Sequence, residues 1–250
     1  MNKPEASFVN GEYKFTLSDY SLDEVDIFVP GISKQEIMDE AAHELEHHGL
    51  TPFDLTDELA DEAYDTVLHR NKLVADQVEL LSVVDVFASR LEQSIPDTVL
   101  NAHIESTVRS LDELVEGEYR DAMYKLMQED MDEFDKFIRA YTTKTLERIF
   151  ATEALADWLD IKEVSEEEAD KMFDEDLSTY VFPCFAYSTD SVADARRLVA
   201  VRQMLDGAKK NYQVETPQES TKRFLSLKGR ESTGSLTLED IIDSIEYLRI

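Results

Sequence analysis

Glycine and proline are scarce in this chain, with 7 glycines and 6 prolines spread over 250 residues. These two residues break helices and shape tight turns, so a chain with few of them is suited to long uninterrupted helices. A fold of many short strands joined by tight turns is disfavoured for the same reason. The sequence therefore predicts a mainly α-helical protein.

Apolar residues recur at three- and four-residue spacing over long windows, as they do along one face of a helix. Two capping boxes mark helix starts, one at Ser33 with Glu36 and one at Ser165 with Glu168. Pro96 suits the first turn of another helix. We expect helices over residues 33–49, 59–91, 97 to the interruption at Gly117, 118–128, 131–159, from 165, over 190–212 and over 237–249.

Alternating apolar residues near the N-terminus are typical of strands rather than helices. Tyr13, Phe15 and Leu17 predict one strand, and Val25 with Ile27 predict another. The sequence therefore allows a short β-hairpin near the N-terminus.

Acidic residues dominate the charge, with 55 Asp and Glu against 25 Lys and Arg and a formal net charge of −30. Such a chain repels nucleic acid phosphates and anionic membrane surfaces, and it attracts basic partners. Because 42% of the residues are hydrophobic, the chain can still bury a core. We expect a soluble protein that binds neither nucleic acid nor membrane.

Cys184 is the only cysteine, so no disulfide can form within the chain. This usage fits a reducing cytoplasm. The start of the chain shows no signal-peptide pattern, and no apolar run reaches membrane-spanning length. The sequence predicts a cytoplasmic location. Cys184 itself is expected to be a packed or interface thiol rather than a nucleophile, because all five histidines lie between residues 43 and 103.

The stretch His43-Glu44-Leu45-Glu46-His47 matches the H-E-x-x-H pattern of zinc peptidases. On the helix expected there, the buried stripe would hold Ile37, Ala41, Leu45 and His48, which leaves His43 and His47 on the opposite, acidic face. The extended motif fails, because Leu50 and Phe53 occupy its glycine and third-histidine positions. We expect a solvated helix face without metal, and a zinc peptidase is the third hypothesis for function.

Asp130, Asp132 and Asp135 lie close together but lack the glycine and the final glutamate of a calcium-binding loop. They predict an acidic helix start. No glycine-rich phosphate loop or serine nucleophile elbow is present in the sequence. We therefore expect neither an enzyme nor a cofactor.

Several segments, in the same order along the chain, resemble the C-terminal chaperone domain of bacterial trigger factor. The proline-marked helix start at residues 95–100 is similar to the start of that family's first arm, and "MDEFDKF" at 131–137 resembles the start of its long arm helix. "EVSEEE" at 163–168 and residues 195–214 resemble later segments, the last of them the helix that returns to the body.

Upstream, residues 19–41 and 55–67 resemble the segments that flank the family's prolyl isomerase insertion, so the resemblance covers roughly residues 19–214. The ribosome-docking domain with its basic loop and the isomerase domain are both missing. The resemblance implies an elongated multi-helix body with helical arms over residues 1–214. Residues 215–250 would form a polar linker and an amphipathic C-terminal helix.

Methionines and aromatic residues cluster in the implied arms beyond what one helix stripe can bury. Flexible methionines and aromatic rings suit a surface that accepts many client shapes. The alternative is that these side chains pack the arms together. The predicted client-binding residues are Tyr119, Met123, Met127, Met131, Phe134, Phe137 and Tyr141 in the arms and Tyr180, Phe182, Phe185 and Tyr187 in an apolar loop.

The resemblance implies an ATP-independent holdase that binds unfolded or nascent polypeptides in a hydrophobic cradle. Ribosome docking and prolyl isomerisation are not implied. A second hypothesis is a dedicated interaction module, in which the cradle binds one partner or the helix at 237–249 of its own or a neighbouring chain. The basic run "KRFLSLKGR" before that helix motivates this alternative.

Overall fold

A computed structural model describes residues 7–32, 34–51, 56–114, 124–125, 127–175 and 191–215. The expectation of a mainly helical fold with a short antiparallel hairpin near the N-terminus is confirmed. None of the helices described is long and apolar enough to cross a membrane. The elements are β1 (Ser7–Asn10), β2 (Tyr13–Thr16), β3 (Glu24–Pro30), α1 (Lys34–His47), α2 (Asp57–Ala88), α3 (Asp97–Leu114), α5 (Met131–Trp158), α6 (Glu166–Glu175), α8 (Ser191–Gly207) and β4 (Lys209–Glu215).

The chain divides into two compact units. Among the described residues, the first unit holds residues 7–25 and 79–210, and the second holds residues 26–78 and 211–215. Three elements, α2, β3 and β4, contribute residues to both units. The boundary between the units passes through these three elements. The expected body over residues 1–214, followed by a linker and helix over 215–250, stays a prediction.

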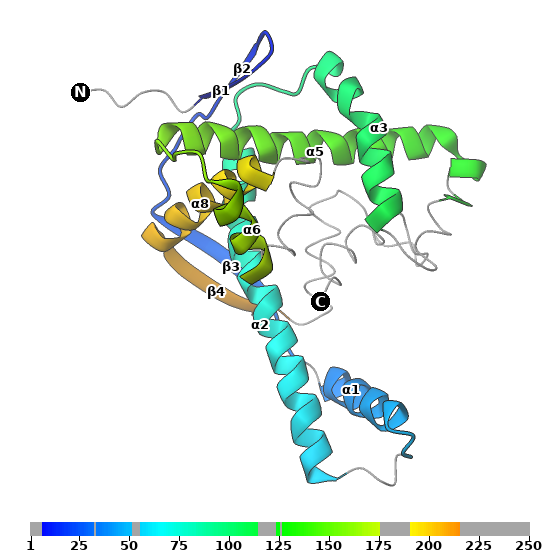
Figure 1. Cartoon of the computed structure of the whole chain (residues 1–250). Helices are drawn as coiled ribbons and strands as arrows, with labels where there is room; N and C mark the ends of the chain where they lie inside the picture. Colours follow the sequence, from blue (N-terminus) through cyan, green and yellow to red (C-terminus); the bar gives the residue numbers. More distant parts are fainter. Residues whose placement is uncertain are drawn as a thin grey trace. The chain divides into compact units, whose positions relative to one another are not determined.

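Helix α5 is the central element of the first unit, and it contacts α3, α8 and both strands of the hairpin (Figure 1). Helix α6 packs against α8. One core cluster forms where the hairpin and the start of α3 meet α5: the ring centroids of Phe15 and Phe150 lie 4.5 Å apart, with Leu100 and Leu146 beside them. Burial of these side chains holds α5 in its place.

The hairpin joins β1 and β2 with Asn10 paired to Tyr13, so only Gly11 and Glu12 form its turn. Gly11 has a φ of +61°, a backbone conformation that glycine adopts without steric cost. The predicted strand around Phe15 is confirmed. Leu17 extends it as an isolated bridge to Leu91, which ties the hairpin to the segment before α3.

The second predicted strand, around Val25 and Ile27, is confirmed as β3, but its partner comes from a region expected to be helical. The sequence predicts a helix over residues 190–212, whereas α8 ends at Gly207 and residues 209–215 form β4, which pairs with β3. The run "KKNYQVE" carries Tyr212 and Val214 at period two, a strand pattern. Pairing with β3, where Asn211 of β4 bonds to Asp26 across a sequence separation of 185 residues, overrides the helical period.

Local signals place most helix ends close to their predicted positions. Thr56 caps α2, since its hydroxyl accepts the backbone N–H of Leu59 at 3.3 Å. Ser165 and Glu168 form the predicted capping box in front of α6, with the backbone N–H of Ser165 donating to the Glu168 carboxylate at 3.0 Å. The predicted helix over 118–128 is described only at residues 124–125 and 127–128, which are helical, and the one over 237–249 lies outside the described residues.

In the second unit, α1 buries Ala41 and Leu45 as predicted and partly buries Ile37. His48 departs from the prediction, because its side chain is exposed and pairs with Glu44 at 3.7 Å. The helix ends at this point: Gly49 has a φ of +67°, and the backbone N–H of Leu50 donates to the carbonyl of Leu45.

Candidate client-binding surface

The first half of α5 begins at Asp130, whose carboxylate accepts the backbone N–H of Glu133 at 3.0 Å. The acidic run around it is therefore a helix start, as predicted. Behind this cap, Phe134, Ile138 and Thr142 follow at four-residue spacing and are all buried. This stripe is the side of α5 that packs into the first unit.

Helix α3 covers part of this stripe. The hydroxyls of Thr107 and Thr142 lie 2.8 Å apart, both completely buried, and each also bonds to a carbonyl of its own helix. Small hydroxyl side chains let two helix backbones approach closely while their polar atoms remain paired. The contact positions α3 against the first half of α5.

Other apolar side chains of α5 and of the segment before it are less buried than this stripe. The rings of Phe137 and Tyr141 stack with their centroids 6.2 Å apart, and both residues are only half-buried. Met131 is 59% exposed, and Tyr124, just before the helix, is 40% exposed. Together with half-buried Met127 we call these five residues the α5 apolar row: Tyr124, Met127, Met131, Phe137 and Tyr141.

The predicted client-binding residues thus fall into three groups. Phe134 is buried in the core at 6% exposure, which makes it a packing residue in this conformation. Met127, Met131, Phe137 and Tyr141 lie in the α5 apolar row, together with Tyr124, which belongs to the same run of methionines and aromatic residues. Tyr119, Met123, Tyr180, Phe182, Phe185 and Tyr187 lie outside the described residues.

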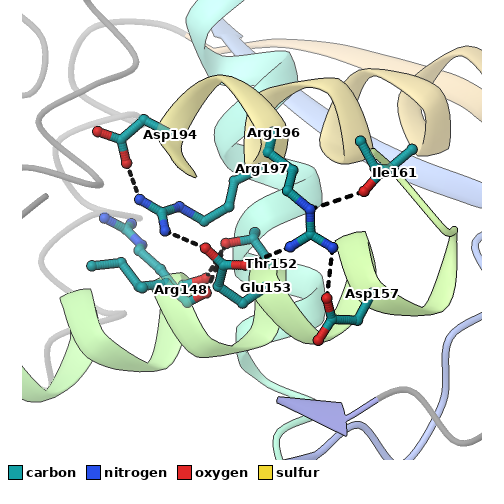
Figure 2. A network of polar contacts seen from close by, with 9 residues as sticks. Arg148, Thr152, Glu153, Asp157, Ile161, Asp194, Arg196 and Arg197 are labelled. Carbon is teal, nitrogen blue, oxygen red and sulfur yellow. Dashed lines mark hydrogen bonds and ion pairs between the residues drawn. The ribbon is translucent and has the colours of Figure 1, made fainter. Parts of the chain in front are cut away.

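The second half of α5 carries a network of buried ions that the sequence did not predict (Figure 2). Arg197 of α8 donates to both Glu153 and Asp194 and is almost completely buried. Its neighbour Arg196 donates to Glu153 at 2.8 Å, to Asp157 at 2.6 Å and to the carbonyl of Ile161 at 2.9 Å. The ion pairs of these two arginines connect α8 to α5. Each charge has a partner because an unpaired charge buried at a helix contact is strongly destabilising.

Arg148 extends the buried charges of α5 to α2. Its guanidinium donates two hydrogen bonds to the Asp85 carboxylate, at 2.7 and 3.2 Å. The Asp85 side chain is 47% exposed, so it is only partly removed from water. This partial desolvation opposes its ionisation, but the charge and hydrogen bonds of Arg148 outweigh it and lower the pKa of that carboxyl below its ordinary value. The pair is therefore ionised at neutral pH and connects these two helices.

His43 and His47 of the zinc-peptidase pattern are exposed on α1, and the ring of His47 lies 5.7 Å from that of His48. Across the described ranges, no three His, Cys, Asp or Glu side chains converge in a metal-binding arrangement. The predicted solvated face is confirmed for the two histidines. Cys184 lies outside the described residues.

The sequence did not predict the exposed apolar residues of the second unit. Tyr64 and Leu68 are each 45% exposed and lie one turn apart on α2, and Met38 of α1 is 55% exposed. The sequence does contain a pattern for them. Tyr64 and Leu68 directly follow the buried residues Ala63 and Val67, and Met38 lies three residues before the buried Ala41. A wider apolar face than the core requires is the pattern that marks them.

Comparison with known protein families, curated proteins and solved structures found no match. The resemblance to trigger factor therefore rests on the sequence segments described above.

Proposed function

We propose that this protein is an ATP-independent holdase related to the chaperone domain of trigger factor, and that the α5 apolar row is part of its client-binding surface. The proposal assigns it unfolded or nascent polypeptides as clients and no covalent chemistry. The single cysteine and the acidic charge suit a cytoplasmic protein that stays soluble while its apolar surface is empty.

The observation that carries the proposal is the arrangement of Phe137, Tyr141 and Met131 on α5. Their neighbours Phe134 and Ile138 are buried in the core, whereas Phe137 and Tyr141 are half-buried and Met131 is 59% exposed. Stacking holds the two rings in place, whereas Met131 can change its rotamer to follow the shape of a client. A surface that is both ordered and adaptable suits many different apolar segments.

Binding at such a surface is weak at each contact and additive over several. Complete burial of one client side chain contributes about 1.5–3 kcal/mol before the cost of ordering the client. A client must therefore engage several positions at once, and it dissociates when its own folding buries the same side chains. This cycle requires no nucleotide.

The test is suppression of aggregation. A chemically unfolded model protein is diluted, with and without an equimolar amount of the full chain, into chelator-treated buffer without ATP, and light scattering is followed. We expect the wild type to suppress scattering and the double variant Phe137→Ser/Tyr141→Ser to lose most of the effect. Tyr64→Ser/Leu68→Ser is the matched control, because it removes an equally spaced pair of partly exposed side chains from α2.

Two results contradict the proposal: a wild type that does not suppress scattering, or a Phe137→Ser/Tyr141→Ser variant that is folded and as effective as the wild type. Circular dichroism of each variant shows that it is folded. Loss of suppression only in the control variant would move the client surface to the second unit.

The second candidate function is a dedicated interaction module. Tyr212 and Val214 favour it, because they share one face of β4, are 52% and 73% exposed, and directly precede the polar C-terminal segment. Deleting residues 215–250 separates the two functions. A holdase occupied by its own C-terminal helix becomes a better suppressor, whereas a dimer built on that helix becomes a monomer in sedimentation analysis.

The zinc peptidase stays a third hypothesis. Elemental analysis of the protein purified without added metal tests it directly, since a structural or catalytic zinc ion would be recovered in a fixed ratio to the chain.

A further inference from the structure

A pocket of about 690 Å³ lies in the first unit, at the other end of α5 from the apolar row. It is formed by the segment after α5, one face of α6 and one face of α8. Its apolar lining consists of Leu159, Ile161, Val164, Met172 and Val199, and each of these side chains is only partly buried. A concave site of this size is within the range of about 300–1,000 Å³ that ligand pockets have.

The segment from Leu159 to Ser165, here called the pocket lip, is held in place at both ends. At its start, Asp160 adopts a left-handed conformation with a φ of +55°, and the backbone N–H of Ile161 donates to the carbonyl of Ala156 at 3.0 Å. The carbonyl of Ile161 in turn accepts a hydrogen bond from Arg196. At the other end, Ser165 is held by its capping box with Glu168.

These contacts fix both ends of the connection between α5 and α6. A left-handed conformation is strained for a residue with a side chain and costs about 1 kcal/mol. The ion network that clamps α8 to α5 includes the bond to the lip, so the pocket wall and the core share one set of contacts. The pocket is therefore formed before any ligand arrives, which lowers the cost of binding.

The middle of the lip has backbone groups that the other described residues do not occupy. Among the residues that the structure describes, the backbone groups of Lys162, Glu163 and Val164 make no hydrogen bond. An extended polypeptide can pair with such a segment through its own main chain, while its side chains enter the adjacent pocket. This feature favours a peptide over a compact small molecule.

The charged side chains around the pocket favour basic peptides over acidic ones. Asp160 and Glu163 on the lip and Glu166, Glu167 and Asp170 on α6 are exposed carboxylates, and Lys162 and Lys171 are the basic residues among its lining. The excess is negative, so basic residues beside an apolar anchor are attracted and acidic ones are repelled.

We infer that this pocket is a peptide-binding site for extended, basic client segments that insert a bulky apolar side chain between α6 and α8. The inference rests on the proposed function only in that its ligand comes from a client polypeptide. It adds a second site with a sequence preference, distinct from the α5 apolar row.

The test measures fluorescence anisotropy of a labelled synthetic peptide, with a central Phe-Leu pair flanked on both sides by lysines, titrated with the full chain. We expect saturable binding that weakens with salt. Gln203→Trp places an indole in the pocket from an exposed position and is expected to weaken binding about tenfold or more, equivalent to about 1.4 kcal/mol. Gln213→Trp is the matched control, an exposed glutamine on β4 outside the pocket.

A second experiment tests the role of charge in binding. Glu163→Lys is expected to weaken binding of the basic peptide at low salt, and the difference from the wild type shrinks at high salt. A peptide with glutamates in place of the lysines, or with serines in place of Phe-Leu, is expected not to bind. Equal binding by Gln203→Trp and wild type, or equal binding of the acidic and basic peptides, overturns the inference.

The aggregation assay shows whether a failure concerns this pocket or the proposed holdase function. If Gln203→Trp suppresses aggregation normally but does not bind the peptide, both conclusions stand, with the apolar row sufficient for bulk suppression. If wild type binds the peptide but suppresses no aggregation, the holdase proposal fails and the pocket remains.

Discussion

The two halves of α5 belong to one continuous helix but lie in opposite environments. Over residues 131–144, burial is confined to one stripe that includes Phe134, Ile138 and Thr142. From Ala151 to Ala156 every residue is buried, so this part of the helix is enclosed on all sides. The first half has apolar side chains in excess of what its core needs, whereas the second half has no exposed face there at all.

The charged residues of the two halves of α5 also lie in different environments. In the first half, Arg139 pairs with Asp135 on the surface, where both side chains remain in water. In the second half, Arg148 and Glu153 are buried and must find ionic partners on α2 and α8. A helix that is enclosed on all sides can keep charged residues only as part of a network. The second half therefore provides rigidity, and the first half provides an available surface.

The largest effect is expected where a buried charge loses its partner. Glu153→Ala leaves both Arg196 and Arg197 without this carboxylate and is expected to lower the free energy of unfolding by about 3–5 kcal/mol in urea denaturation. Asp157→Ala removes another partner of Arg196, but one whose side chain is 48% exposed, and should cost no more than about 1 kcal/mol. Equal losses from the two variants would mean that burial does not distinguish these ion pairs.

A similar contrast is expected within the first half. Phe134→Ala removes a buried ring and should destabilise the protein by about 3–5 kcal/mol. Met131→Ala, three residues earlier, should change stability by less than about 0.5 kcal/mol and instead weaken suppression of aggregation. Thermal unfolding and the aggregation assay, run on the same two variants, separate packing from client contact. A large loss of stability in Met131→Ala would assign that residue to the core.

Acid should affect the pair of Arg148 and Asp85 more than the surface pair of the first half, because Arg148 is buried even though the Asp85 side chain is 47% exposed. Because the folded-state pKa of Asp85 is lower than its ordinary 3.8, ionised Asp85 stabilises the fold above that pH, and this contribution is lost as pH falls through the folded value. The difference in unfolding free energy between wild type and Asp85→Asn should thus be present at pH 7 and shrink below about pH 4.

Asp135→Asn is the control for this pH dependence, because both members of the pair with Arg139 are exposed to solvent. Its unfolding free energy should stay close to that of the wild type, within about 0.5 kcal/mol, at both pH values. A pH-independent difference for Asp85→Asn would show that Arg148 does not hold that carboxylate in its charged form.

Local chemistry explains which parts of this structure the sequence could predict. The start of α5 at Asp130, the capping box at Ser165 and the end of α1 at Gly49 each depend on residues within one turn. Because all the residues involved are neighbours along the chain, such helix ends can be predicted from the sequence alone. Part of the apolar row was predictable on the same ground, since an excess of aromatic residues and methionines over one stripe is visible in the sequence.

Long-range contacts explain what was missed. Strand β4 pairs with β3 across most of the chain, and Arg197 reaches Glu153 from a helix 44 residues away. The burial of Phe134, in contrast to half-exposed Phe137, depends on which side of α5 faces the core. No pattern within α5 decides this, because both rings belong to one broad apolar face. Arg196 and Arg197 did leave a trace, as adjacent basic residues between Ala195 and Leu198, with the acidic Asp194 just before them.

The smallest effect concerns the point where the enclosed half of α5 ends. Helices α1 and α5 end with the same pair of backbone bonds, but α1 has Gly49 in the left-handed position and α5 has Asp160. Asp160→Gly relieves the strain of a side chain there and should raise the free energy of unfolding by about 0.5–1 kcal/mol, whereas Gly49→Asp should lower it by a similar amount. Opposite signs in urea denaturation would show that the pocket lip retains a strained residue at the expense of stability. If Asp160→Gly is instead destabilising, the Asp160 side chain makes a contribution in the folded protein that exceeds its backbone strain.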